Sequence, residues 1–149
     1  MTGGSGEAGL VAVFDTNILL RVALARTPLA RAIRAAWEQG DFLLLISDAT
    51  LSEIGRVLRY PRIAKRYTLT EPVIQGFEAS VRATAVRVPG LYAVRKIEAD
   101  PSDDKFLACA LEGDADLIVS EDAHLRDLKE YQGIQIISLE QFSTILGLT

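Results

Sequence analysis

The sequence contains only one cysteine and one histidine, and each shortage excludes a class of protein. Cys109 alone cannot form an intramolecular disulfide, which fits a reducing cytoplasm. It lies in the apolar stretch FLACAL, so we interpret it as a small buried hydrophobe and not as a nucleophile. Because Cys109 and His124 cannot supply the ligands of a structural zinc site, we expect any metal to be held by oxygen.

Long apolar runs and targeting signals are also missing. No apolar run reaches the roughly 18 residues that a membrane span needs. Residues 1–10 are polar and lack the basic and apolar regions of a signal peptide, so we expect a flexible tail there and a single cytoplasmic domain over 11–149. A hydrophobic content of 49% with 24% charged residues is typical of a globular domain. The net charge of −4 gives no global reason to expect nucleic-acid binding.

Short apolar runs alternate with longer segments of helical spacing. Strands are predicted at residues 11–15, 42–47, 85–88, 116–120 and 134–138, mostly as continuous apolar runs that are typical of strands covered on both faces. Helices are predicted at residues 27–40, 48–60, 70–85, 101–115 and 138–146, the last with Ser138 and Gln141 at capping-box spacing. This alternation predicts an α/β fold: a Rossmann-like three-layer sandwich in which helices cover both faces of a mostly parallel sheet of about five strands.

Acidic residues recur where the predicted strands end. Asp15 ends the first strand, Glu53 lies in the helix after the second, Asp103 and Asp104 open a later helix, and Asp122 follows the strand at 116–120. The carboxyl ends of parallel strands meet at one edge of the sheet, where ligands of such folds bind. We therefore expect these acids to lie close together, although each Asp taken alone could also be a helix N-cap.

Several carboxylates in one crevice would repel each other, raise their own pKa values and destabilise the fold. A Mg²⁺ or Mn²⁺ ion removes this conflict because it takes oxygen ligands and pairs with a substrate phosphate. Such an ion acidifies a bound water and stabilises the charge that develops on the phosphate. The acids therefore predict metal-dependent hydrolysis of a phosphodiester. For Glu53 the alternative is a surface ion pair with Arg56.

Four motifs together resemble one family: VFDTN, SDATLSEIGRVL, DPSDDKFLACALEGDADLIVSEDAHL and IQIISLEQF. They resemble the PIN-domain ribonucleases, and most closely the VapC-like toxins of type II toxin–antitoxin pairs, over residues 11–142. The resemblance implies a PIN-like fold and a hydrolase that cuts RNA endonucleolytically with Mg²⁺ or Mn²⁺. It also implies a homodimer and a protein antitoxin whose peptide could occlude the acidic crevice.

The resemblance also assigns roles to individual residues. The catalytic set that it implies consists of Asp15, Glu53, Asp104 and Asp122. The metal ligands within this set would be Asp15, Asp104 and Asp122, while Glu53 would act through a bound water or as a base. Supporting polar roles fall to Thr16, Asn17, Asp103 and Ser120. Many relatives carry glycine where this chain has Glu121, which adds negative charge near the last acid.

A basic stretch begins on the same predicted helix as Glu53. Residues 55–67, GRVLRYPRIAKRY, contain five basic side chains, two tyrosines and no acid. This pattern is typical of a solvated helix face or of a surface that follows phosphates. Because an acidic pocket needs cations nearby to hold RNA, the candidate contacts to the RNA backbone are Arg56, Arg59, Arg62 and Lys65.

Two other functions stay open at this stage. The chain could be an RNA-maturation nuclease outside any toxin–antitoxin pair, which a neighbouring antitoxin gene would argue against. It could also be a non-catalytic PIN-like module that binds RNA or protein, which a broken acidic set would favour. A haloacid-dehalogenase-type phosphatase is excluded, because that chemistry needs a second Asp two residues after Asp15, where Asn17 stands.

Overall fold

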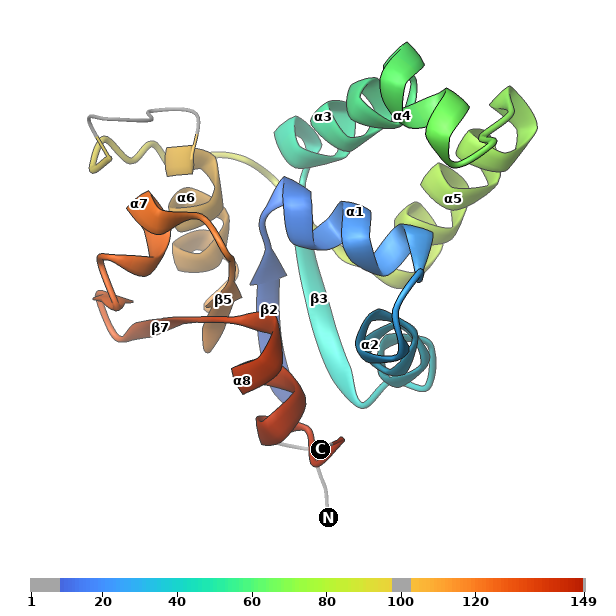
Figure 1. Ribbon diagram of the computed structural model, residues 1–149. Coiled ribbons are helices and arrows are strands. Elements are labelled where there is room, and N and C mark those ends of the chain that lie inside the picture. The colour runs from blue at the N-terminus through green and yellow to red at the C-terminus, as the bar shows by residue number, and fades with distance from the viewer. Residues whose placement is uncertain (1–8, 98–102, 149) are drawn as a thin grey trace.

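The computed structural model describes residues 9–97 and 103–148, and Figure 1 shows helices on both sides of a central sheet. Within these residues the sheet has six strands in the order β4-β3-β2-β5-β7-β6. The strands are β2 (Leu10–Phe14), β3 (Phe42–Ser47), β4 (Val86–Val88), β5 (Leu117–Val119), β6 (Glu130–Tyr131) and β7 (Ile134–Ile137). Every neighbouring pair is parallel except β6 and β7. The predicted three-layer α/β fold with a mostly parallel sheet is confirmed.

The helices in the described residues include all five that the sequence predicts and three more. They are α1 (Thr16–Leu24), α2 (Pro28–Glu38), α3 (Asp48–Leu58), α4 (Pro61–Arg66), α5 (Glu71–Thr84), α6 (Asp104–Glu112), α7 (Ala123–Arg126) and α8 (Leu139–Ile145). The additions are α1, α4 and α7. Each of them closely follows a strand or another helix, so its apolar residues do not form a pattern separate from that of the preceding element. The first residues of the helix predicted at 101–115, and most of the tail predicted at 1–10, lie outside the described residues.

Polar side chains at the helix starts explain why several helices begin where they do. Ser47 accepts the Thr50 N–H at the start of α3, and Thr27 accepts the Ala30 N–H at the start of α2. The capping box of Ser138 and Gln141 is present at α8. Each such cap satisfies a backbone donor that the helix itself leaves free and typically contributes about 1 kcal/mol.

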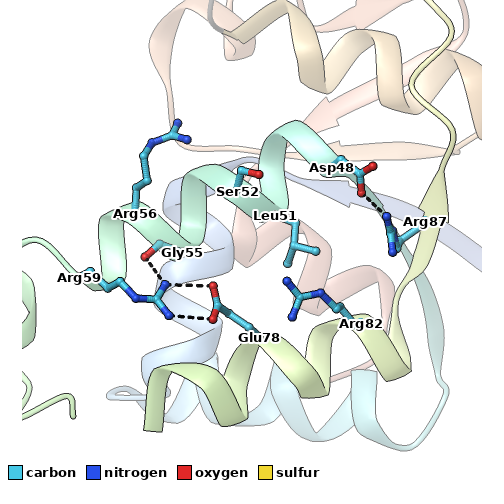
Figure 2. Close-up of a pocket in the computed structure, with 9 residues that line it drawn as sticks. All are labelled: Asp48, Leu51, Ser52, Gly55, Arg56, Arg59, Glu78, Arg82 and Arg87. Carbon is cyan, nitrogen blue, oxygen red and sulfur yellow. Dashed lines mark hydrogen bonds and ion pairs between the residues drawn. The ribbon is translucent and has the colours of Figure 1, made fainter. Parts of the chain in front are cut away.

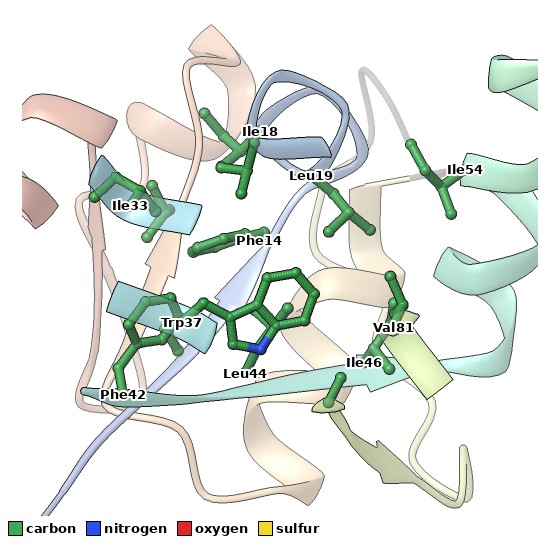
Figure 3. Packing of buried hydrophobic residues seen from close by; sticks show 14 of the residues in the cluster. Phe14, Ile18, Leu19, Ile33, Trp37, Phe42, Leu44, Ile46, Ile54 and Val81 are labelled. Atoms are coloured by element: carbon green, nitrogen blue, oxygen red, sulfur yellow. The ribbon is translucent and has the colours of Figure 1, made fainter. Parts of the chain in front are cut away.

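Two apolar cores lie on opposite faces of the sheet, because successive side chains of a strand alternate between faces. Phe14 of β2 faces the larger core under α1, α2, α3, α5 and α8, whereas Val13 faces the smaller core under α6 and α7. Figure 3 shows part of the larger core around Trp37. The rings of Phe14, Phe42 and Phe142 pack there with centroids 4.9 to 5.8 Å apart.

The smaller core contains Cys109, which confirms the interpretation of this residue as a buried hydrophobe. Burial raises the pKa of the Cys109 thiol to about 12, so the thiol stays neutral and unreactive. Among residues 9–97 and 103–148, none of the helices is both long enough and apolar enough to span a bilayer.

Candidate metal centre

Asp15 lies directly after β2, which runs between β3 and β5 in the sheet. Its carboxylate is 4% exposed and makes two different contacts. Oδ1 accepts the Ile18 N–H at 2.8 Å, which caps α1. Oδ2 accepts the Ser120 hydroxyl at 2.5 Å. Asp15 is therefore a helix cap and also part of a polar cluster that spans two strands.

Ser120 connects this carboxylate to the next acid. It follows β5 and is fully buried. While its hydroxyl donates to Asp15, its Oγ accepts the Asp122 N–H at 2.9 Å. Asp122 in turn caps α7 by accepting the N–H groups of His124 and Leu125 at 2.8 and 3.3 Å. The supporting role predicted for Ser120 therefore has a defined geometry in the fold.

Glu53 extends from the second turn of α3 towards the start of α1. Its Oε1 accepts the Thr16 hydroxyl and lies 3.2 Å from the Lys105 ammonium. Lys105 comes from α6, and its ammonium also lies 4.6 Å from the centre of the Phe106 ring. Thr16 and Lys105 thus take the place of the surface pairing with Arg56 that was the alternative role for Glu53.

A pocket of about 180 Å³ brings the acids together. Its lining consists of Asp15, Thr16, Asn17, Glu53, Val57, Asp103, Phe106 and Asp122. Six of these eight residues belong to the predicted acidic and supporting polar sets, and only Val57 and Phe106 do not. The acids come from four separate segments of the chain, as the sheet-edge argument predicts.

Asp104 does not line this pocket, whereas the neighbouring Asp103 does. The Asp104 carboxylate accepts the backbone N–H groups of Lys96 and Ile97 at 3.2 and 2.8 Å and is 9% exposed. Consecutive residues at the start of a helix point about 100° apart, so only one of the two acids can face the pocket. In the structure Asp104, predicted as a metal ligand, therefore lies outside the pocket and binds the backbone of residues 96 and 97.

The charges in the pocket act on one another. The pKa of Asp15 is raised, first by burial and then by the negative charges of Asp122 and Glu121, while the hydrogen bonds from Ser120 and Ile18 oppose the shift. A buried carboxylate next to other acids is a site where a bound cation would relieve repulsion. Oxygen donors of this kind suit a hard divalent ion, so the residues present fit Mg²⁺ or Mn²⁺.

Comparison with known proteins decides the family. A family model described as PIN domain matches residues 11–124. The chain belongs to the PIN-domain family. Among curated proteins, none matches it. A chain in the crystal structure of VapBC2 from Rickettsia felis, bound to a DNA fragment from their promoter, is similar in fold with a TM-score of 0.55 and 10% sequence identity; the match covers 87% of this chain and 98% of that one.

Membership of this family supports a nuclease that uses a divalent metal. His124 is a candidate donor that the sequence did not predict. Asp103, Asp122 and His124 each offer one ligand atom, and these three atoms lie within 4.8 Å of one another. The only sequence signal was the position of His124 two residues after an acid that caps a helix.

The Glu121 side chain makes its contacts outside the acidic pocket. Its carboxylate lies 3.3 Å from the Arg126 guanidinium and accepts the Leu139 N–H at the start of α8 at 3.0 Å. It does not line the acidic pocket. The negative charge that replaces the glycine of many relatives is therefore partly balanced by Arg126 and by the N-terminal end of α8.

The predicted RNA contacts divide into two groups. Arg59 is held by Glu71 and Glu78 of α5, with its Nη2 at 2.6 and 3.0 Å from their carboxylates, and Figure 2 shows the pair with Glu78. This network occupies the whole guanidinium, so in the structure Arg59 links the end of α3 to α5. Arg56 points away from that network in Figure 2 and lines a pocket of about 560 Å³. Arg62 and Lys65 are exposed on α4.

Proposed function

We propose that this PIN domain is a metal-dependent endoribonuclease whose catalytic residues are Asp15, Glu53, Asp103 and Asp122. The observation that supports the proposal is the convergence of these four carboxylates on one pocket of about 180 Å³. Three of them, Asp15, Asp103 and Asp122, would hold a Mg²⁺ or Mn²⁺ ion. When bound, such an ion neutralises the phosphate and makes a water more acidic.

The protein's own side chains prepare the site for this chemistry. Ser120 and the Ile18 N–H fix the two oxygens of Asp15, so this carboxylate is held without rearrangement. Thr16 and Lys105 both contact Oε1 of Glu53, so Glu53 is oriented from two sides. We assign to Oε2 of Glu53 the acceptance of the proton from the attacking water. Preorganised groups of this kind account for a large part of enzymatic rate enhancement.

The RNA backbone would be held outside the acidic pocket by cations. We propose Arg56, Arg62 and Lys65 for this role, because each is exposed and lies on α3, which carries Glu53, or on the helix α4 that follows it. Phosphate contacts by Lys and Arg supply most of the sequence-independent affinity for nucleic acid. Arg59 is left out because Glu71 and Glu78 hold it.

We further propose that the chain is the toxin of a toxin–antitoxin pair, with an antitoxin partner and a homodimeric state. The sequence motifs and the fold of a chain in VapBC2 support this reading. Co-expression with the product of an adjacent gene tests it: the partner should co-purify and suppress RNA cleavage. A chain without such a neighbour would instead be an RNA-maturation nuclease with the same chemistry.

The test of the enzymatic proposal is incubation of the purified protein with end-labelled single-stranded RNA in Mg²⁺ or Mn²⁺. EDTA and the Asp15→Asn variant serve as controls that should both abolish cleavage. We expect products with a 5′-phosphate and a 3′-hydroxyl. Cleavage in EDTA, or a 2′,3′-cyclic phosphate on the product, would contradict this mechanism. Intact RNA together with no binding of divalent ions would favour the non-catalytic module.

A further inference from the structure

His124 is the single histidine of the chain, and its side chain lies beside the acidic pocket without lining it. Its Nδ1 is 3.8 Å from Oδ1 of Asp122, and the side chain is 48% exposed. Asp103 also offers a carboxylate oxygen within 4.8 Å of the other two ligand atoms. An imidazole nitrogen and two carboxylate oxygens therefore lie close together beside the acidic pocket.

The spacing of these atoms fits coordination of one ion. Metal–ligand bonds of His nitrogen and carboxylate oxygen are about 2.0–2.2 Å long. Two donors on the same ion therefore lie roughly 3 to 4.4 Å apart. One ligand atom from each of the three residues lies within 4.8 Å of the other two, so coordination of one ion needs only a small side-chain movement.

Backbone contacts hold His124 in this position. The His124 N–H donates to Oδ1 of Asp122 at 2.8 Å, and the Leu125 N–H donates to the same oxygen. Leu125 is fully buried in the smaller core, so the turn that carries His124 is anchored in the fold. In the described part of the chain these hydrogen bonds to Asp122 all go to Oδ1, which leaves Oδ2 for a ligand.

We propose that His124 is a metal ligand and that Asp103, Asp122 and His124 form a mixed oxygen and nitrogen site. This proposal rests on the proposed function only in its claim that the acidic pocket holds a divalent ion. Mg²⁺ is bound by oxygen, whereas imidazole suits ions such as Zn²⁺ and Co²⁺. With His124 as a ligand, the ratio of the affinity for Zn²⁺ or Co²⁺ to the affinity for Mg²⁺ is higher than the carboxylates alone would give.

The presence of one histidine makes a direct test possible. In tag-free protein labelled with ¹⁵N, every imidazole signal belongs to His124. Titration with Zn²⁺ should shift the Nδ1 resonance strongly, and Mg²⁺ should leave it nearly unchanged. An Nδ1 resonance that does not respond to Zn²⁺, while calorimetry detects Zn²⁺ binding to the same sample, would overturn the assignment of His124 as a ligand.

Calorimetric titration of variants measures the contribution of His124. We expect His124→Ala to weaken Zn²⁺ and Co²⁺ binding at least tenfold, since even an outer partner of a metal ligand contributes about 10- to 100-fold. Mg²⁺ affinity should change much less. Asp127→Asn is the matched control, because it removes a charge at the end of the same short helix outside the ligand group. It should alter no affinity by more than about twofold.

The possible outcomes separate this proposal from the proposed function. If His124→Ala weakens the binding of all three ions equally, or of none, His124 is not the nitrogen ligand, while the oxygen site stands. If the wild-type protein binds no divalent ion, both proposals fail together. If Asp122→Asn abolishes binding of every ion while His124→Ala affects only Zn²⁺ and Co²⁺, both are supported.

Discussion

The hydroxyl of Ser120 lies 2.5 Å from Oδ2 of Asp15, although the two residues are 105 positions apart in the sequence. Oγ of Ser120 also accepts the backbone N–H of Asp122 at 2.9 Å. One buried hydroxyl therefore joins the ends of β2 and β5 and sets the spacing of two acids that we propose as metal ligands.

Substitution of this hydroxyl should weaken metal binding. In Ser120→Ala we expect the affinity for Mn²⁺ to fall about 10- to 100-fold, because outer partners orient the ligands of a metal. Leaving buried Asp15 without this donor should also destabilise the fold by about 1–3 kcal/mol. Calorimetry and thermal unfolding measure the two effects. Ser143→Ala is the control, because Ser143 is equally buried but bonds to Glu140 in α8; equal losses in both variants would contradict the role of Ser120.

Asp15→Asn should change how stability depends on pH. Because burial and neighbouring charges raise the pKa of Asp15, the folded protein binds a proton there more tightly than the unfolded chain does. The free energy of unfolding of the wild type therefore falls as pH rises from about 4, the usual pKa of Asp, through the raised value. Asn keeps an oxygen for the α1 cap and carries no charge, so this fall should disappear.

Thermal unfolding in EDTA from about pH 4, near the usual pKa of Asp, up to neutral pH tests this expectation. At neutral pH, Asp15→Asn should have a Tm at least equal to that of the wild type. A drop of more than about 4 °C, which corresponds to roughly 1 kcal/mol or more for a domain of this size, would contradict the argument from carboxylate repulsion.

Lys105→Met should separate catalysis from stability. The ion pair of Lys105 with Glu53 is partly exposed, so its loss should cost no more than about 1 kcal/mol. Met has a similar length and its thioether can contact the Phe106 ring, but it loses the charge contacts of the Lys105 ammonium. Because small errors in the position of a reacting group can reduce rates about 100-fold, we expect RNA cleavage to fall by about 10- to 100-fold. Exposed Lys129→Met is the control, and cleavage at equal rates in the two variants would rule out a positioning role for Lys105.

Arg56 and Arg59 should behave differently although they lie one turn apart. Arg56→Ala should weaken RNA binding. It should also reduce the slope of log K against log[salt] by about the amount expected for one phosphate contact. Arg59→Ala should leave that slope unchanged and lower the Tm, since it releases Glu71 and Glu78. Fluorescence anisotropy with labelled RNA at several salt concentrations, in the inactive Asp15→Asn background, measures the slopes. A larger loss of slope in Arg59→Ala would reverse the assignment.

Periodicity and residue type were sufficient to predict most of the sheet, five of the eight helices in the described residues and the edge where the acids meet. They depend on local patterns, namely apolar runs for the buried strands and capping side chains such as Ser138 for the helix starts. The short elements α7 and β6 were not predictable, because a single turn or a pair of residues is too short for a period.

The choice between Asp103 and Asp104 could not be made from the pattern of residues either. It depends on where α6 starts and on the N–H groups of Lys96 and Ile97, which attract the second carboxylate. The engagement of Arg59 likewise depends on how α5 packs against α3, which brings Glu71 and Glu78 near across 12 and 19 positions of sequence. Contacts between distant segments decided both assignments.

The central claim is that the acidic pocket, with Asp103 and without Asp104, cuts RNA with a divalent ion. The most direct measurement compares RNA cleavage in Mn²⁺ by Asp103→Asn and Asp104→Asn, with the Tm of each variant recorded alongside. We predict that Asp103→Asn is folded and inactive, whereas Asp104→Asn still cleaves below its lowered Tm, because it loses only the anchor of residues 96 and 97. Cleavage at the wild-type rate by Asp103→Asn, or a fully stable and inactive Asp104→Asn, would contradict the account.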